Sequence, residues 1–123
     1  MSGVVYLTTN QVVLINASFG CSVRERGTVD AATMRCAHGY EGTEFYPTLW
    51  EKAAALLWAL ATTQGFSDGN KRTAWTAMET FLALNGQFLR TSVVDAHVFV
   101  LAIANRAIEH EQVVEWLIQH RRA

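Results

Sequence analysis

A run of apolar residues at helical spacing dominates the middle of the chain. Apolar side chains recur there at i, i+4, i+7 and i+11, and two leucines widen the stripe: Trp50, Ala54, Leu57, Ala61, Leu56 and Leu60. Thr48 and Glu51 precede the stripe with the spacing of a capping box, which sets the start of a helix. A helix that is apolar over most of its surface is stable only when other elements surround it. The sequence therefore predicts a central buried helix within a bundle.

Most of the remaining chain also follows a helical pattern. We expect helices from Thr8 or Thr9 to about Phe19, from Val29 to Ala37, from Asn70 to Asn85, from Val93 to about Arg106 and from Glu111 to His120. Two glycines and three aromatic residues make the segment from Gly39 to Tyr46 better suited to a loop or a small hairpin. Because Pro47 is the only proline and no repeat divides the chain, residues 1–123 should form a single all-α domain of about six helices.

The composition excludes several classes of protein. Half of the residues are apolar and 17% are charged, so the chain can bury a core and is not a disordered tail. A net charge of -1 gives no overall basic field, so we expect neither direct nucleic-acid binding nor membrane binding. Met1 to Thr9 lack the pattern of a secretion signal, which predicts a cytoplasmic protein with Cys21 and Cys36 as free thiols. The glycosylation sequon that begins at Asn16 is then a coincidence.

A polar, glycine-rich segment from Gln64 to Thr73 separates the two most apolar helices. Glycine allows backbone amides to approach an anion, and a helix that begins at Asn70 directs its free amides to the same point. Lys71 and Arg72 add positive charge, and Asp68 offers a hard oxygen ligand for Mg²⁺. These residues favour a metal-bound nucleotide. A plain turn, in which Asp68 caps the helix and the basic side chains are solvated, is the alternative that the residues alone leave open.

The segment 66–74 reads FSDGNKRTA and resembles the signature H-x-F-x-D-G-N-K-R-T-A of the Fic/Doc family, in the form typical of its Doc toxins. Further stretches are similar to the same proteins, so that the resemblance covers nearly the whole chain. They are Tyr6 to Thr8, Tyr46 to Leu49, Glu51 to Leu57, Phe81 to Gly86, and Trp116 with Leu117. The resemblance implies a compact Fic/Doc helical bundle with a short hairpin-like flap.

The resemblance also implies a role for each residue of the loop. Asp68 would hold Mg²⁺, Gly69 and Asn70 would form an anion nest, and Lys71 and Arg72 would grip the phosphates of ATP. Family members that transfer AMP usually have glycine at the position of Lys71. Those with lysine are protein kinases, which transfer the γ-phosphate to a threonine of elongation factor Tu and so block translation.

Gln64 departs from the family pattern, because it stands where the signature has histidine. In the family this histidine is the general base that takes the proton from the attacking hydroxyl. Glutamine cannot do so, and general-base catalysis typically contributes about 10²–10⁴ in rate. The isolated His38, His97, His110 and His120 offer no convincing replacement. The chain is then either a natural binder without catalysis or an active toxin whose histidine was replaced. A non-catalytic nucleotide- or protein-binding module and a Fic AMP-transferase are the alternative functions.

Two further expectations follow from the resemblance. None of the glutamates has serine or threonine four residues before it, so no inhibitory helix of the Fic type is visible in the chain. Inhibition would then come from a separate Phd-like antitoxin, whose C-terminal segment folds as a helix in a groove of the toxin. The stretch from Tyr40 to Tyr46 would be the family's flap, lying beside the active site and pairing with substrate backbone. Its alternative is a surface loop with aromatic side chains packed on the core.

Overall fold

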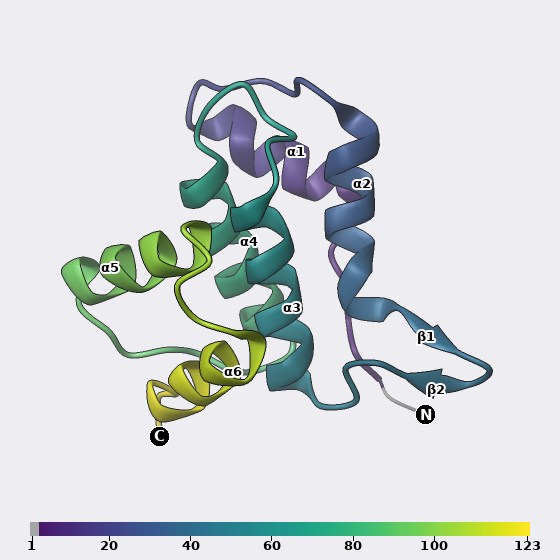
Figure 1. Cartoon of the computed structure of the whole chain (residues 1–123), viewed down its shortest axis with the longest axis vertical. Coiled ribbons are helices and arrows are strands. Elements are labelled where there is room, and N and C mark those ends of the chain that lie inside the picture. Colours follow the sequence, from purple (N-terminus) through teal and green to yellow (C-terminus); the bar gives the residue numbers. More distant parts are fainter. Residues whose placement is uncertain (1–2) are drawn as a thin grey trace.

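The computed structural model describes residues 3–123 and shows an all-α bundle with one short hairpin (Figure 1). Met1 and Ser2, which the predicted domain includes, lie outside the described residues. The elements in chain order are α1 (Thr9–Ser18), α2 (Arg26–Met34), the 3₁₀ turn η1 (Arg35–Ala37), β1 (Gly39–Tyr40), β2 (Thr43–Glu44), α3 (Leu49–Thr62), α4 (Asn70–Leu84), α5 (Val93–Ala104) and α6 (His110–Gln119). The predicted architecture of about six helices with a hairpin is confirmed.

Helix α3 is the centre of the bundle, as its apolar surface predicts. It runs antiparallel to α4 and also packs against α2, α5, α6 and η1. Residues 52–57 and 59–61 of this helix are all buried. The alanines among them allow neighbouring helices to approach closely, and the leucines fill the space between helices. Trp50 and Trp58 lie at the edge of the core and are only partly buried, because the indole is too large to be enclosed there.

The helix starts follow the capping rules, with two corrections to the predicted boundaries. Thr8 and Thr48 each form a complete capping box. Ser92 caps α5 by accepting a hydrogen bond from the amide of Asp95 at 3.0 Å, without the reciprocal half of the box, because an aspartate side chain is one methylene shorter than glutamate. Helix α2 begins at Arg26, three residues before the predicted start, and ends in η1. Its first turn is polar because this turn lies on the surface, which hid the start from a hydrophobic pattern.

The hairpin lies at the N-terminal end of α3. Gly39 pairs with Glu44 and Tyr40 with Thr43, and both turn residues, Glu41 and Gly42, have positive φ. One buried cation of α3 holds the hairpin to the core: Lys52 is 1% exposed and donates to Glu44 Oε1 at 2.8 Å and to the carbonyl of Tyr46. Burial lowers the pKa of Lys52, but the hydrogen bond to Glu44 and the charge of that carboxylate outweigh this effect. The pKa therefore lies above its usual value, and the amine stays protonated.

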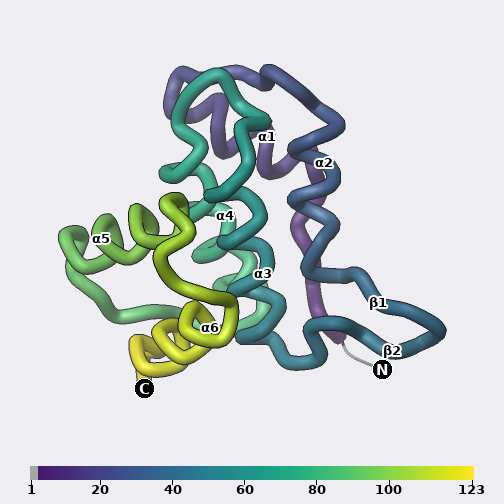
Figure 2. The backbone as a smooth tube through the Cα atoms, viewed as in Figure 1, coloured from purple at the N-terminus to yellow at the C-terminus, as the bar shows by residue number. Residues whose placement is uncertain are grey.

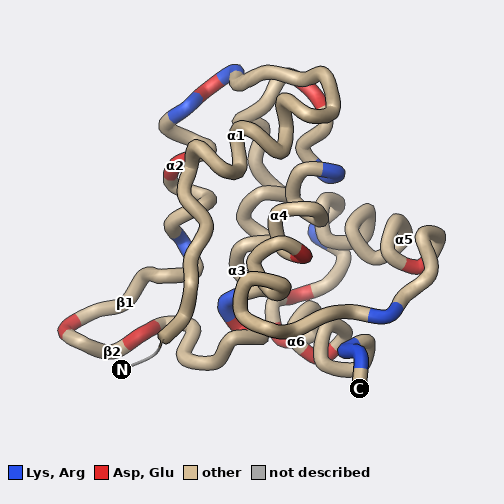
Figure 3. The backbone as a smooth tube through the Cα atoms, turned by 180° about the vertical axis from the view of Figure 1, so that it is seen from behind, with Lys and Arg blue, Asp and Glu red and all other residues tan. Residues whose placement is uncertain are grey.

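Positions of both charge signs are spread along the chain (Figure 3), which agrees with the small net charge. Both cysteines are free, with Cys36 buried and Cys21 half-buried. Burial raises the pKa of the Cys36 thiol to about 11. Within residues 3–123, every helix is too short or too polar to cross a lipid bilayer.

Candidate functional site

The loop that joins α3 to α4 is held in shape by the link between α1 and α2. The two segments lie side by side at one end of the bundle (Figure 2). Val23 and Phe66 form an isolated antiparallel bridge, and the amide of Ser67 donates to the carbonyl of Ser22 at 2.9 Å. Phe66 is only 3% exposed and anchors the loop in the core. A loop fixed by backbone bonds and one buried ring presents its polar groups in a defined arrangement.

Two glycines of the loop occupy positions where a side chain would be strained. A Cβ on Gly65 would lie 2.7 Å from Cγ2 of Val29, and the Gly65 carbonyl accepts hydrogen bonds from two backbone amides of the link. Gly69 has φ +70° and is the N-cap of α4, with Cys21 Sγ 3.1 Å from the position of a Cβ. The left-handed conformation turns the chain into α4 within one residue. Both glycines therefore serve the shape of the loop.

Asn70 braces the loop with its side chain. Its Oδ1 accepts a hydrogen bond from the amide of Phe66, and its Nδ2 donates to the carbonyl of Phe66, both at 3.1 Å. The backbone amides of Asn70, Lys71 and Arg72 make no hydrogen bond within residues 3–123. They are the first amides of α4, where the positive end of the helix dipole lies. The backbone of Asn70 is therefore available to an anion, while its side chain has a structural task.

Asp68 exposes its carboxylate at the entrance of the loop. One oxygen, Oδ1, accepts a hydrogen bond from the amide of Gly69 at 2.8 Å, and the side chain forms no ion pair with any described residue. The backbone carbonyl of Asp68 accepts a hydrogen bond from Nδ2 of Asn16 at 3.0 Å. This arrangement fixes the backbone of Asp68 and leaves carboxylate oxygen free for a cation. Groups of three or more His, Cys, Asp or Glu that could hold a metal do not occur in the described part of the chain. A divalent ion at Asp68 would thus need phosphate and water oxygens to complete its shell.

Asn16 is the residue of this site that the sequence analysis missed. It is fully buried in α1, and the same Nδ2 also donates to Oγ1 of Thr73 in α4 at 3.0 Å. Its Oδ1 has no partner among the described residues. Thr9, Val12 and Asn16 recur at i, i+3 and i+7, so the spacing of the apolar face of α1 could have revealed a buried amide.

All six residues predicted for the site line a single cleft of about 810 Å³: Gln64, Asp68, Gly69, Asn70, Lys71 and Arg72. Lys71 and Arg72 are exposed, and the guanidinium carbon of Arg72 lies 5.1 Å from the ring centre of Phe19. The opposite wall comes from α5, through Val93, His97 and Val100 among others. No sequence pattern indicated this wall, because α5 is distant from the loop along the chain.

Gln64 lies at the rim of the cleft with an exposed side chain. Its Oε1 is 3.5 Å from Nδ2 of Asn70, and its backbone carbonyl accepts a hydrogen bond from Nη2 of Arg24 at 2.7 Å. The amide can orient a polar group by hydrogen bonding but has no basic nitrogen. His97 is the only histidine that lines this cleft within the described residues.

The predicted position of the flap is wrong. None of the residues from Tyr40 to Tyr46 lines the cleft, and the hairpin and the loop lie at opposite ends of α3 (Figures 1 and 3). The fourteen residues of α3 separate them by about 21 Å at about 1.5 Å per residue. The hairpin therefore does not lie beside the cleft in this structure. The hairpin lies on the surface, as the alternative states, but of its three aromatic side chains only Tyr46 packs against the core, while Tyr40 and Phe45 are exposed.

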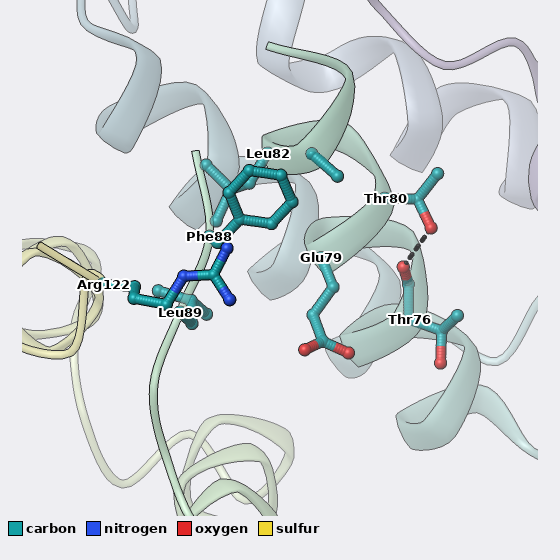
Figure 4. A pocket seen from close by; sticks show the side chains of 8 residues that line it. Thr76, Glu79, Thr80, Leu82, Phe88, Leu89 and Arg122 are labelled. Atoms are coloured by element: carbon teal, nitrogen blue, oxygen red, sulfur yellow. Dashed lines mark hydrogen bonds between the residues drawn. The ribbon is translucent and has the colours of Figure 1, made fainter. Parts of the chain in front are cut away.

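A smaller hollow of about 330 Å³ lies along α4, away from the loop (Figure 4). Glu79 and Arg122 face it from different segments, and the hydroxyl of Thr80 is used in a hydrogen bond to the carbonyl of Thr76 at 2.7 Å. Burial raises the pKa of Glu79, and a hydrogen bond from Trp75 partly offsets this rise. The hollow shares no residue with the cleft.

Comparison with known proteins agrees with the arrangement of the loop. The Fic/DOC family profile matches residues 6–82, which is more than half of the chain and includes the whole loop. The chain belongs to the Fic/DOC family. Toxin Doc of Mycolicibacterium smegmatis is 53% identical to it over 64 residues, which make up 52% of this chain and 49% of that protein. The chain thus matches about half the length of this curated relative.

Proposed function

We propose that this member of the Fic/DOC family is a Doc-like toxin domain that binds Mg²⁺ and ATP in the cleft, and that its kinase activity is impaired by Gln64. The observation that supports binding is the convergence of different groups on one cleft. A free carboxylate, two cationic side chains and three amides at the start of α4, which have no partner within residues 3–123, all face the same space. This set of groups favours the binding of a polyphosphate with a divalent cation over the alternative of a plain turn that binds no ligand.

Each residue has a distinct task in this proposal. Asp68 would hold Mg²⁺, and Gly69 would bring the backbone close to the phosphates. The amides of Asn70, Lys71 and Arg72 would donate to phosphate oxygens, while the side chains of Lys71 and Arg72 neutralise their charge. When bound, Mg²⁺ and ATP supply the phosphoryl group and the divalent charge that stabilises its transfer.

The acceptor in this proposal is a threonine hydroxyl of elongation factor Tu. A hydroxyl attacks phosphate efficiently only when a base accepts its proton, and Gln64 has no basic atom. Gln64 would hold the hydroxyl by a hydrogen bond without removing its proton. Under this proposal, the chain binds the nucleotide but transfers its γ-phosphate slowly.

The test is the transfer of labelled γ-phosphate from ATP to elongation factor Tu. We expect Gln64→His to raise the rate by about 10²–10⁴ over the unchanged chain. Gln64→Glu tests the need for a base in a second way, because its carboxylate has a similar volume to the amide and can accept a proton. Equal rates for the unchanged chain and the Gln64→His variant would contradict the proposed mechanism, and transfer of AMP by that variant would favour the AMP-transferase alternative.

A non-catalytic binding module is the second candidate, and Gln64 itself favours it. In that case the chain would bind Mg²⁺ and ATP, and Gln64→His would restore no transfer to any protein. Titration calorimetry should show binding of Mg²⁺ and ATP to the unchanged chain and to Gln64→His for either candidate. The transfer assay separates them, because only the toxin candidate regains phosphate transfer with Gln64→His.

We also propose that a Phd-like antitoxin inhibits the active form, as the name of the related Toxin Doc suggests. Exposed apolar side chains on α5, beside the cleft, offer a surface for an apolar partner segment: Val93, Val94 and Val98 are 85%, 70% and 60% exposed. We expect the Gln64→His variant to arrest growth when expressed alone and to be harmless when its antitoxin is co-expressed. Growth of cells that express the variant alone would contradict this proposal.

A further inference from the structure

A second cavity, of about 460 Å³, lies between α3, the start of α6 with the link before it, and residues on either side of the hairpin. It has no lining residue in common with the cleft that faces the Fic/DOC loop. Trp58 of α3 and His110 of α6 lie in its wall, with Arg35 and Arg106 beside them. The cavity therefore belongs to a different part of the molecule from the proposed nucleotide site.

Two buried polar atoms in this wall have no partner among the described residues. They are Nε1 of Trp58 and Nε2 of His110. The indole N–H is a donor only, and leaving a buried donor unsatisfied costs about 1–3 kcal/mol. A buried polar atom without a protein partner is satisfied by water or by a ligand that brings hydrogen-bond acceptors.

Two guanidinium groups add positive charge above the same indole. The guanidinium carbons of Arg35 and Arg106 lie 6.0 Å and 5.1 Å from the ring centre of Trp58. Neither arginine forms an ion pair within residues 3–123. Arg35 donates to the hydroxyl of Tyr46 at 3.4 Å, so the proton of that hydroxyl is free for a further acceptor. Both arginines are exposed, and their side chains can move to admit a ligand to the indole.

The backbone at Arg106 is held in a conformation that is rare for arginine. Its φ is +57°, in the left-handed region, although asparagine or glycine would adopt this conformation at lower cost. The side chain of Arg106 also reaches the carbonyl of Thr62, at 3.5 Å, where α3 ends. This contact places the guanidinium beside the cavity.

The other lining residues limit the kind of anion. Glu109 and Glu111 also face the cavity and balance the formal charge of the two arginines. A polyphosphate would be repelled by these carboxylates, whereas a single negative charge can sit on the arginine side. Ala55, Ile108 and the face of Trp58 supply apolar surface. The cavity thus combines donors for one small anion with room for an apolar group.

We propose that this cavity binds a carboxylate carried on an apolar or aromatic stem. The carboxylate would accept hydrogen bonds from the indole of Trp58 and from Arg35 and Arg106, and the stem would contact Ala55 and Ile108. The ligand is either a free small acid or the carboxyl end of a peptide, since both present the same group. The proposal does not depend on nucleotide binding at the Fic/DOC loop.

The test follows the indole N–H signals of the four tryptophans by two-dimensional NMR, with the Trp58 signal assigned through Trp58→Phe. The probes are 3-phenylpropionate, the neutral 3-phenylpropionamide, inorganic phosphate and the peptide acetyl-Gly-Phe with a free carboxyl end. We expect 3-phenylpropionate to shift the Trp58 signal saturably and to bind at least tenfold more tightly than its amide. Tighter binding of the peptide would assign the site to a chain end, and tighter binding of the small acid would assign it to a free acid.

Variants locate the binding in this cavity. Arg35 lies in η1 and Arg106 in the link between α5 and α6, and the changes Arg35→Gln and Arg106→Gln should each weaken binding of the acid at least threefold. Arg122→Gln is the matched control, because Arg122 stacks on Phe88 in the separate hollow (Figure 4). No saturable shift with either carboxylate probe, equal binding of acid and amide, or binding of phosphate as tight as that of the acid would each overturn the proposal.

Discussion

The backbone and the side chain of Asp68 have different roles. Its backbone carbonyl is bound by buried Asn16, while its carboxylate touches only the neighbouring amide of Gly69. The fold therefore depends on the main chain of Asp68 and little on its side chain. Exposed polar contacts of this kind typically contribute less than about 1 kcal/mol to stability.

We expect Asp68→Asn and Asp68→Ala to unfold at nearly the same temperature as the unchanged chain in the absence of ligand. Both should lose the thermal stabilisation that Mg²⁺ and ATP give, because neither retains a charged oxygen ligand. Asn keeps an acceptor for the amide of Gly69 and so isolates the effect of charge. Differential scanning calorimetry measures both quantities. If the ligand-free Asp68→Asn variant unfolded many degrees earlier, Asp68 would be a structural cap.

Asn16, in contrast, acts through its buried side chain. Its amide joins α1 to the loop and to Thr73 of α4, and these partners are 52 and 57 residues away along the chain. Helical spacing could place Asn16 on the inner face of α1. Its partners could not be predicted, since no local pattern relates residues so far apart.

At the scale of secondary structure, capping residues and apolar spacing predicted most helix boundaries to within one or two residues. The predicted starts of α3, α4 and α5 are confirmed, because Thr48, Gly69 and Ser92 end the preceding segments by local geometry. The start of α2 was wrong by three residues, since its first turn is polar and exposed and lacks a side-chain cap. Local chemistry thus sets the start of an element where a cap is present.

Two glycines allow a matched test of how the loop is packed. Gly65→Ala places a methyl group 2.7 Å from Val29, and we expect a loss of about 1–3 kcal/mol in the free energy of unfolding. Gly27 lies in α2 with nothing within 4 Å of its Cβ position, so Gly27→Ala should be neutral or stabilise by up to about 1 kcal/mol. Urea unfolding of both variants gives the comparison. Equal stability of the two variants would show that α2 does not pack tightly against the loop at Gly65.

Across the complete fold, α3 supports two cavities of different character. The larger cavity lies between the loop and α5, and the smaller lies between Trp58 and the start of α6. Both depend on contacts between segments that are distant in sequence. Burial of His110 in the second cavity also links its protonation to the stability of the entire fold.

Burial, with a smaller effect from the charge of Arg35, lowers the pKa of His110, although Glu111 and Glu51 oppose this shift. The unfolded chain then binds a proton more readily, so His110 makes the free energy of unfolding fall as the pH drops below about 6.5. We expect His110→Gln to lose this component and to show a shallower decline between about pH 7 and pH 5.5. Chemical denaturation across this range compares the two chains, in which all other titrating groups are the same. Parallel pH profiles would contradict the assignment.

Local patterns in the sequence were enough to establish the helical class, the central place of α3, the hairpin and the residues of the loop. These features depend on apolar spacing, caps and turn residues that act within a few positions, and the loop carries a compact motif of the Fic/DOC family. Tertiary packing was needed to show that α5 forms the opposite wall of the cleft, that Asn16 holds the loop and that the hairpin lies away from it. Such contacts are set by the packing of helices around α3, in which each partner is chosen by shape and burial over the whole chain and not by its neighbours in sequence.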